Sequence, residues 1–164
     1  MKCFALICLL TAVSVLGCGG PPYQVRPDRV NDAARYKGTY SSQSSWPARW
    51  YAFSIESIDG KQGKTPYLIS SEPDDLRLIE SGEHVVVLRC EGVDDYNYHA
   101  RVAARVDFLP NTIYIVNGRI TPDRIFFWIE REDTKDKITP EMQAWRDDTP
   151  ISGMTFFPVF SPKK

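Results

Sequence analysis

Hydrophobic and polar residues alternate along much of the chain after residue 45. In residues 99–108 every second side chain is apolar, and two arginines lie among the residues between them. Residues 50–58 show the same period of two, which is typical of a β-strand with one packed face and one wet face. Shorter apolar runs that also predict strands lie at residues 67–69, 76–79, 84–90, 112–116 and 124–131.

Turn-forming residues separate these runs. Turn signals lie at residues 59–66, 81–82, 110–111 and 121–123. The pair Asn117-Gly118 strongly favours a two-residue hairpin turn. The chain therefore predicts about seven short strands without alternating helices, a pattern typical of an all-β, antiparallel β-sandwich. We expect this domain to span residues 45–164.

The last part of the chain carries a helix signal. Thr139 is a suitable N-cap and Pro140 fits the first helical position, so we expect one short C-terminal helix over residues 140–146. Residues 124–131 before it are apolar on both faces and need cover on both sides. We expect the aromatic tail, residues 154–160, to fold back as part of that cover.

The first residues describe an export signal. Lys2 precedes an apolar run over residues 3–16, which is too short to cross the roughly 30 Å hydrocarbon core of a bilayer. Residues 15–18 read Val-Leu-Gly-Cys, which resembles the lipobox of bacterial lipoproteins. The resemblance implies a signal peptide over residues 1–17 and an acylated Cys18 as the first residue of the mature chain. Two alternatives remain open, an ordinary secretory signal with Cys18 incidental and an uncleaved anchor.

The same resemblance implies a location. Gly19, and not an aspartate, follows the lipobox cysteine. In an envelope with two membranes, this is similar to lipoproteins of the outer membrane, so we expect a chain that faces the periplasm and is held by its acyl chains. Residues 18–44 are rich in proline and glycine, and we expect them to form the lipidated N-terminus and a flexible linker.

Composition narrows the function classes. Removal of residues 1–17 leaves 147 residues, a length that suits one domain with its own core. This mature chain has 19 basic and 21 acidic residues, a balance that argues against nucleic acid as a partner. Cys90 is then the one cysteine besides Cys18, so we expect no internal disulfide. Its apolar strand neighbours favour a buried, inert thiol.

Two short motifs resemble a known surface domain. Residues 58–66 read IDGKQGKTP and residues 81–87 read SGEHVVV. Together they resemble the PEGA-type surface domain. Residues 106–114 are similar to a strand–turn step of small envelope lipoproteins with transthyretin-like sandwiches. The resemblance implies a β-sandwich fold and carries no implication about activity.

Candidate chemistry is sparse. The GxSxG, HExxH and CxxC motifs and a glycine-rich phosphate loop are all absent from the sequence. A catalytic triad or a two-histidine metal site would have to use His84 and His99, the two histidines of the chain. Both begin predicted strands beside turns, so a hydrogen bond that braces a turn is the simpler interpretation. Residues 91–98 carry acidic side chains that suit calcium, but a solvated hairpin tip explains them equally well. We expect no cofactor and no metal.

Two groups of side chains are candidates for binding. Trp46 and Trp50 flank a polar loop and are the tentative partner-binding residues, the alternative being that they plug one end of the sandwich. Arg101 and Arg105, with Arg89 nearby, form a predicted exposed row that would meet an anionic surface or remain a solvated strand face.

These features favour a non-enzymatic, lipid-anchored protein of the cell envelope. We expect it to bind a protein or a cell-wall component, or to help assemble or maintain the envelope. One alternative is a small hydrolase or metal-dependent enzyme that uses His84 or His99. Another is an inhibitor of a cell-wall lytic enzyme.

Overall fold

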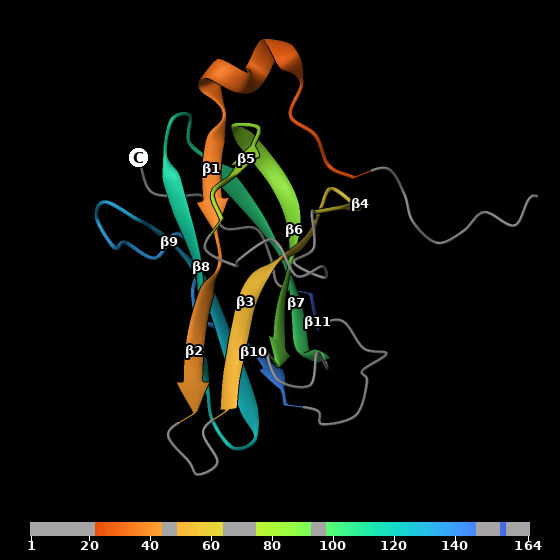
Figure 1. The fold of residues 1–164 in the computed structure, drawn as a ribbon, viewed down its shortest axis with the longest axis vertical. Coiled ribbons are helices and arrows are strands. Elements are labelled where there is room, and N and C mark those ends of the chain that lie inside the picture. The colour runs from red at the N-terminus through yellow and green to blue at the C-terminus, as the bar shows by residue number, and fades with distance from the viewer. Residues whose placement is uncertain (1–21, 44–48, 64–74, 93–97, 147–154, 157–164) are drawn as a thin grey trace, which may run out of the picture.

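The structure is a computed structural model that describes residues 22–43, 49–63, 75–92, 98–146 and 155–156, most of them in β-strands (Figure 1). A 3-10 helix, η1 (Pro27–Asp32), precedes the first strand. The strands are β1 (Ala34–Lys37), β2 (Thr39–Gln43), β3 (Arg49–Ile58), β4 (Lys61–Gln62), β5 (Arg77–Ile79), β6 (Gly82–Gly92), β7 (Tyr98–Phe108), β8 (Ile113–Ile120), β9 (Arg124–Arg131), β10 (Met142–Trp145) and β11 (Thr155–Phe156).

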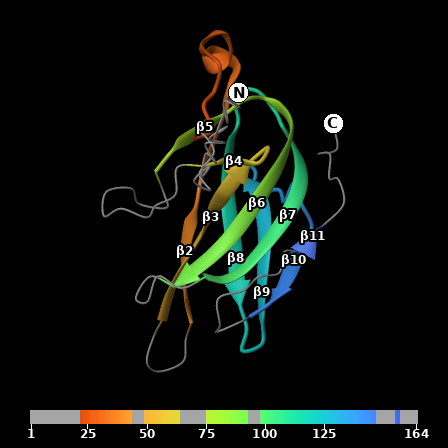
Figure 2. The same ribbon diagram turned by 90° about the vertical axis from the view of Figure 1, so that its right-hand side faces the viewer.

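The strands form two sheets that pack face to face. Sheet A has the order β10-β9-β8-β1-β5, and sheet B has the order β11-β7-β6-β3-β2 with β4 paired to β3. Figure 2 shows β6 and β7 lying across β8 and β9. The described pairs are antiparallel except β1 with β8 and β11 with β7. The all-β sandwich that the alternating pattern predicts is therefore confirmed.

The core lies between the sheets and takes every second residue of each long strand. In β7 the predicted apolar row from Ala100 to Phe108 is buried. The ring of Phe53 in β3 meets that of Phe127 in β9 edge to face, with ring centres 5.6 Å apart. Such an arrangement is favoured by the charge distribution of aromatic rings. The two sheets are thus held together by interlocking apolar side chains.

The hairpin predicted at Asn117-Gly118 is wrong, because both residues lie inside β8. A Cβ atom at Gly118 would lie 2.0 Å from Cε1 of Phe53, which is far closer than such atoms can approach. Glycine is needed there because the Phe53 ring packs directly on the strand backbone. The chain reverses instead at residues 121–123, another predicted turn.

The turn signal at Asp59-Gly60 is confirmed. The two residues have positive φ values of 51° and 73° and connect β3 to β4. Positive φ at both central positions is the signature of a type I′ hairpin turn.

The predicted helix over residues 140–146 is also wrong, because β10 occupies this segment and pairs antiparallel with β9. Its side chains alternate, with Met142 buried and Trp145 exposed. The strand supplies hydrogen-bond partners to β9, which would otherwise be an open edge. The expected cap residue Thr139 has another role, since its hydroxyl accepts a 2.9 Å hydrogen bond from the backbone N–H of Ile129.

The expected linker over residues 18–44 is largely part of the folded domain. Residues 22–43 of this stretch are described, and they contribute β1 to sheet A and β2 to sheet B. The backbone N–H of Tyr23 already donates a 2.8 Å hydrogen bond to the carbonyl of Gln62 in β4. The two strands are only four and five residues long, so they carry too few alternations to stand out in the sequence.

The cover expected from the aromatic tail falls mostly on residues 154 and 157–160, which lie outside the described residues. Of residues 154–160 the structure describes β11, which pairs with β7 in sheet B. The outward side chains Phe126 and Trp128, which need cover, belong to β9 in sheet A. Within the described residues their cover comes from cations, as shown below.

Candidate functional site: an aromatic and cationic sheet face

His84 is committed to a structural role. Its Nδ1 atom lies 2.6 Å from Oδ2 of Asp59, and its Nε2 atom lies 2.9 Å from the carbonyl oxygen of Glu80. The other carboxylate oxygen of Asp59 accepts a hydrogen bond from the backbone N–H of Val85. Both ring nitrogens of His84 therefore have hydrogen-bond partners within the fold. The predicted bracing hydrogen bond is confirmed.

Two further residues, Tyr23 and Arg26, extend this contact. We call the whole group the N-terminal clamp: Tyr23, Arg26, Asp59, Glu80 and His84. Arg26 binds the Glu80 carboxylate through its backbone N–H and its guanidinium at 2.9 to 3.2 Å. These hydrogen bonds lower the pKa of Glu80 to about 2. The backbone N–H of Glu80 donates to the Tyr23 hydroxyl at 3.1 Å. The clamp therefore fixes the segment before η1 to the sandwich.

The predicted exposed row of arginines is wrong in one position and neutralised in the others. Arg89 is fully buried and forms an ion pair with Glu91. Arg101 forms a 2.9 Å ion pair with a glutamate of β3, and Arg105 a looser one at 3.7 Å with a glutamate of β6. Because each arginine has a carboxylate partner, the row offers little net positive charge to an anionic surface.

The other predicted candidates have the following places. Cys90 is buried, as expected, and burial raises the pKa of its thiol well above the usual range, so it is an inert core residue. The backbone of His99 lies in β7, and its side chain lies outside the described part of the structure. The acidic loop at residues 93–97 also lies outside it, as do Cys18 and Trp46. Among the residues that are described, no group of three or more His, Cys, Asp or Glu side chains is placed to hold a metal ion.

Trp50 is half exposed, so it does not plug the core. It lies in β3 next to Ser42 of β2, on the outward side of sheet B. The described residues do not show it meeting another aromatic side chain, and its role as a partner-binding residue stays a prediction.

A richer surface lies on the opposite sheet. We define the aromatic face as these outward residues of sheet A and of the segment before β10: Arg119, Arg124, Phe126, Trp128, Lys137, Glu141, Gln143 and Trp145. Strand register brings them together, since Phe126 of β9 lies between Arg119 of β8 and Gln143 of β10. Arg124 lies opposite Trp145 in the same way.

Each aromatic ring of this face has a cation over it. The guanidinium carbon of Arg119 lies 4.1 Å from the centre of the Phe126 ring. The corresponding distance from Arg124 to Trp145 is 4.2 Å. The ammonium nitrogen of Lys137 lies 4.3 Å from the centre of the Trp128 ring. An exposed cation–π contact contributes about 0.5–1 kcal/mol, so the side chains are held in order by one another.

A carboxylate forms hydrogen bonds with two of the cations. Glu141 accepts hydrogen bonds from Lys137 at 2.5 Å and from Arg119 at 3.2 Å. These bonds lower the pKa of the Glu141 carboxyl. The indole N–H of Trp128 donates to Glu130 at 2.7 Å. The face is thus a pre-ordered surface rather than a set of loose side chains.

Trp145 is the most exposed aromatic side chain of the face, with 66% of its surface exposed. Exposed tryptophan and arginine are the residue types that dominate binding energy at protein interfaces, because they combine large apolar area with directed hydrogen bonds. The sequence did not lead us to this residue, because the helix predicted for residues 140–146 placed it on no sheet. The alternation of Met142 and Ala144 with Gln143 and Trp145 was the signal that could have found it.

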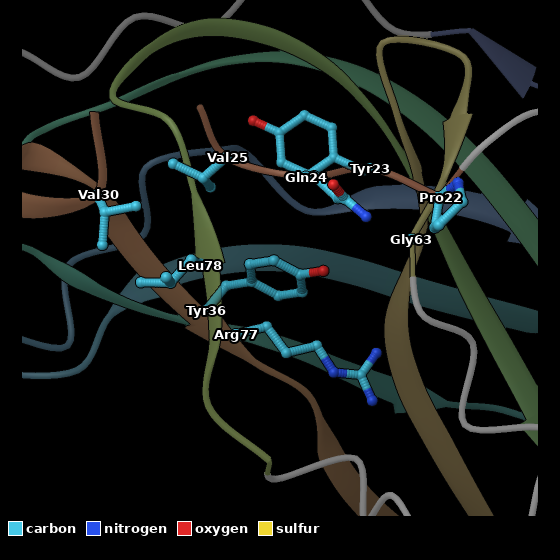
Figure 3. Close-up of a pocket in the computed structure, with 9 residues that line it drawn as sticks. All are labelled: Pro22, Tyr23, Gln24, Val25, Val30, Tyr36, Gly63, Arg77 and Leu78. Atoms are coloured by element: carbon cyan, nitrogen blue, oxygen red, sulfur yellow. The ribbon is translucent and has the colours of Figure 1, made fainter. Parts of the chain in front are cut away.

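The structure also has an open groove of about 460 Å³ at the N-terminal end (Figure 3). It runs between the segment from Pro22 to Val30 and the strands β1 and β5. Tyr36 and Arg77 lie side by side in it. Burial raises the pKa of the Tyr36 phenol, while the Arg77 guanidinium opposes that rise. None of its nine lining residues is acidic.

Comparisons with protein-family models, curated proteins and solved structures find no match for this chain. In the part of the chain that the structure describes, no helix is both long and apolar enough to cross a membrane. The function is therefore inferred from the sequence and from the surfaces above.

Proposed function

We propose that this chain is a non-enzymatic, lipid-anchored binding protein of the bacterial cell envelope, held in the outer membrane and facing the periplasm. The lipobox-like residues 15–18 support the anchor at Cys18. The aromatic face supports binding, because three cation–aromatic pairs and a largely exposed Trp145 are gathered on one sheet. The partner is a protein or a cell-wall component that docks on this face.

The aromatic face is the observation that carries the proposal. A large exposed tryptophan costs solubility, and its presence on an ordered surface favours an interface. The geometry of His84 supports the non-enzymatic part of the proposal, since both of its ring nitrogens already have partners within the fold. No observation in the described residues specifically favours a hydrolase, a metal enzyme or an inhibitor of a lytic enzyme.

Site-directed photocrosslinking tests the binding role. A photoreactive amino acid at Gln143, which is exposed at the centre of the aromatic face, is introduced into the native chain in intact cells. We expect a discrete adduct that disappears when Trp145→Ala is added. The matched control carries the same amino acid at Ser42, which is exposed on sheet B. An adduct from Ser42 that depends on Trp50, with none from Gln143, would move the binding site to the residues first predicted.

The anchor is tested separately. We expect Cys18→Ala to release the chain from the membrane fraction and to remove the mass of the acyl groups. Unchanged membrane retention, with no added mass on the native chain, would contradict acylation.

A further inference from the structure

The N-terminal clamp makes the link between anchor and domain very short. Three residues, 19–21, separate Cys18 from Pro22, the first described residue. An extended chain spans at most about 3.6 Å per residue, so the two Cα atoms lie within roughly 14 Å of each other. A free linker over residues 18–44 would have reached roughly 90 Å by the same measure. The clamp therefore shortens the tether several-fold.

The domain is longer than this tether. The eleven-residue strands β6 and β7 span roughly 37 Å at about 3.4 Å per residue. A body of that length on a link of roughly 14 Å cannot move far from the surface that holds the anchor. The surface around Pro22 must then face the bilayer closely.

The groove of Figure 3 is the surface at this point, because Pro22 is one of its walls. Its rim carries exposed apolar side chains, with Val30 43% and Leu78 39% exposed. Arg77 is its one cationic lining residue, and no carboxylate lines it. Apolar rim residues with a cation suit the boundary between lipid head groups and acyl chains, where phosphates are the available anions.

We propose that this groove is a membrane-contact surface, pressed against the phospholipid bilayer by the short tether. The inference rests on the proposed lipid anchor at Cys18. It also places the rest of the molecule. The η1 end lies near the start of β8, and Trp145 lies beside the turn at the end of β8 (Figure 1). Strand β8 is eight residues long, so Trp145 lies roughly 24 Å from the η1 end, measured along the sandwich. The end of the aromatic face that carries Trp145 therefore lies away from the bilayer.

Lipid quenching tests the contact. The mature, acylated chain, which begins at Cys18, is reconstituted into phosphatidylethanolamine and phosphatidylglycerol vesicles that contain nitroxide-labelled lipid. A thiol-reactive fluorophore is attached at Val30→Cys in one variant and at Pro122→Cys, exposed in the β8–β9 turn, in the matched control. Cys90 does not interfere, because it is buried. We expect the label at residue 30 to lose most of its fluorescence and the label at residue 122 to keep it.

Two outcomes separate this inference from the anchor. If the chain sediments with vesicles in a Cys18-dependent way but the two labels remain equally bright, the groove does not touch lipid and the inference is overturned while the anchor stands. If sedimentation does not depend on Cys18, the anchor itself is wrong and the inference falls with it. A label at residue 30 that is shielded from a water-soluble quencher but is not quenched by nitroxide lipid indicates a second copy of the chain on the groove and also overturns the inference.

Discussion

The N-terminal clamp and the aromatic face contain similar charged and aromatic side chains but differ in what these contact. In the clamp, Glu80 and His84 point their polar atoms at partners within the chain, and the contacts join segments far apart in sequence. In the aromatic face, the cations stack on rings and leave Trp145 largely open. Paired charges alone therefore do not mark a binding site. An ordered apolar surface that is exposed to solvent is the better indicator of a binding site.

The largest expected effect is on the clamp. Asp59→Ala removes the acceptor for His84 and for the Val85 N–H, and it places alanine at a φ of 51°. A donor left unsatisfied costs about 1–3 kcal/mol, so we expect the free energy of unfolding in urea to fall by roughly 2–3 kcal/mol. Asp123→Ala, in an exposed turn, should change it by less than about 0.5 kcal/mol. Equal losses in the two variants would show that the clamp is not structural.

The next effect is on binding through the aromatic face. Trp145→Ala should weaken the affinity for the captured partner roughly 30-fold, as expected for an interface tryptophan worth about 2 kcal/mol. Since the side chain is mostly exposed, the urea midpoint should hardly move. Titration of the purified partner against both tryptophan variants checks this. A larger loss from Trp50→Ala than from Trp145→Ala would assign the site to sheet B.

A third effect is on the pH dependence of stability. Hydrogen bonds from Arg26 lower the pKa of Glu80 from 4.5 to about 2. A carboxyl with a lowered folded-state pKa stabilises the fold above its unfolded value, and this stabilisation is lost as the pH falls from about 4.5 towards 2. Urea unfolding at pH 6 and pH 3 should therefore differ less in Glu80→Gln than in the parent chain.

Glu141 offers the matched comparison for this pH effect. Its pKa is also lowered, by Lys137 and Arg119, but its side chain is 36% exposed whereas that of Glu80 is 17% exposed. Solvent screens exposed pairs, so Glu141→Gln should change the pH dependence less than Glu80→Gln. The reverse order would place the stronger ion pair on the aromatic face.

The smallest effect concerns the order within the aromatic face. A double-mutant cycle with Arg119→Met and Phe126→Leu should give a coupling energy of about 0.5 kcal/mol in the free energy of unfolding. A cycle with Arg119→Met and Ile113→Val, distant along β8, serves as the control and should give no coupling. No coupling between Arg119 and Phe126 either would mean that the ring and the cation are not held together in solution.

The sequence predicted the architecture better than the surfaces. Alternation over residues 99–108 and the Asp59-Gly60 turn follow directly from strand geometry, and both are confirmed. The prediction of a hairpin at Asn117-Gly118 was wrong because the glycine is needed for a different reason, which is the close packing of the Phe53 ring from the other sheet. Local turn propensity contains no information about such a distant contact.

The aromatic face was hidden for a similar reason. Phe126 and Arg119 are seven residues apart and lie on different strands, so only the register of β8 and β9 makes them neighbours. Trp145 joins them only because residues 140–146 add a strand to β9, where a local cap signal had suggested a helix. Conversely, the role of His84 as a turn brace was visible from its place beside a turn.

Oxidative footprinting of intact envelopes shows whether a partner covers the aromatic face. Hydroxyl radicals modify exposed tryptophan side chains, and mass spectrometry reports the extent at Trp145 and Trp50 in the same sample. We predict that Trp145 is protected in the envelope relative to the purified acylated chain, while Trp50 reacts equally in both. Equal reactivity of Trp145 in the two preparations, or protection confined to Trp50, would contradict the account.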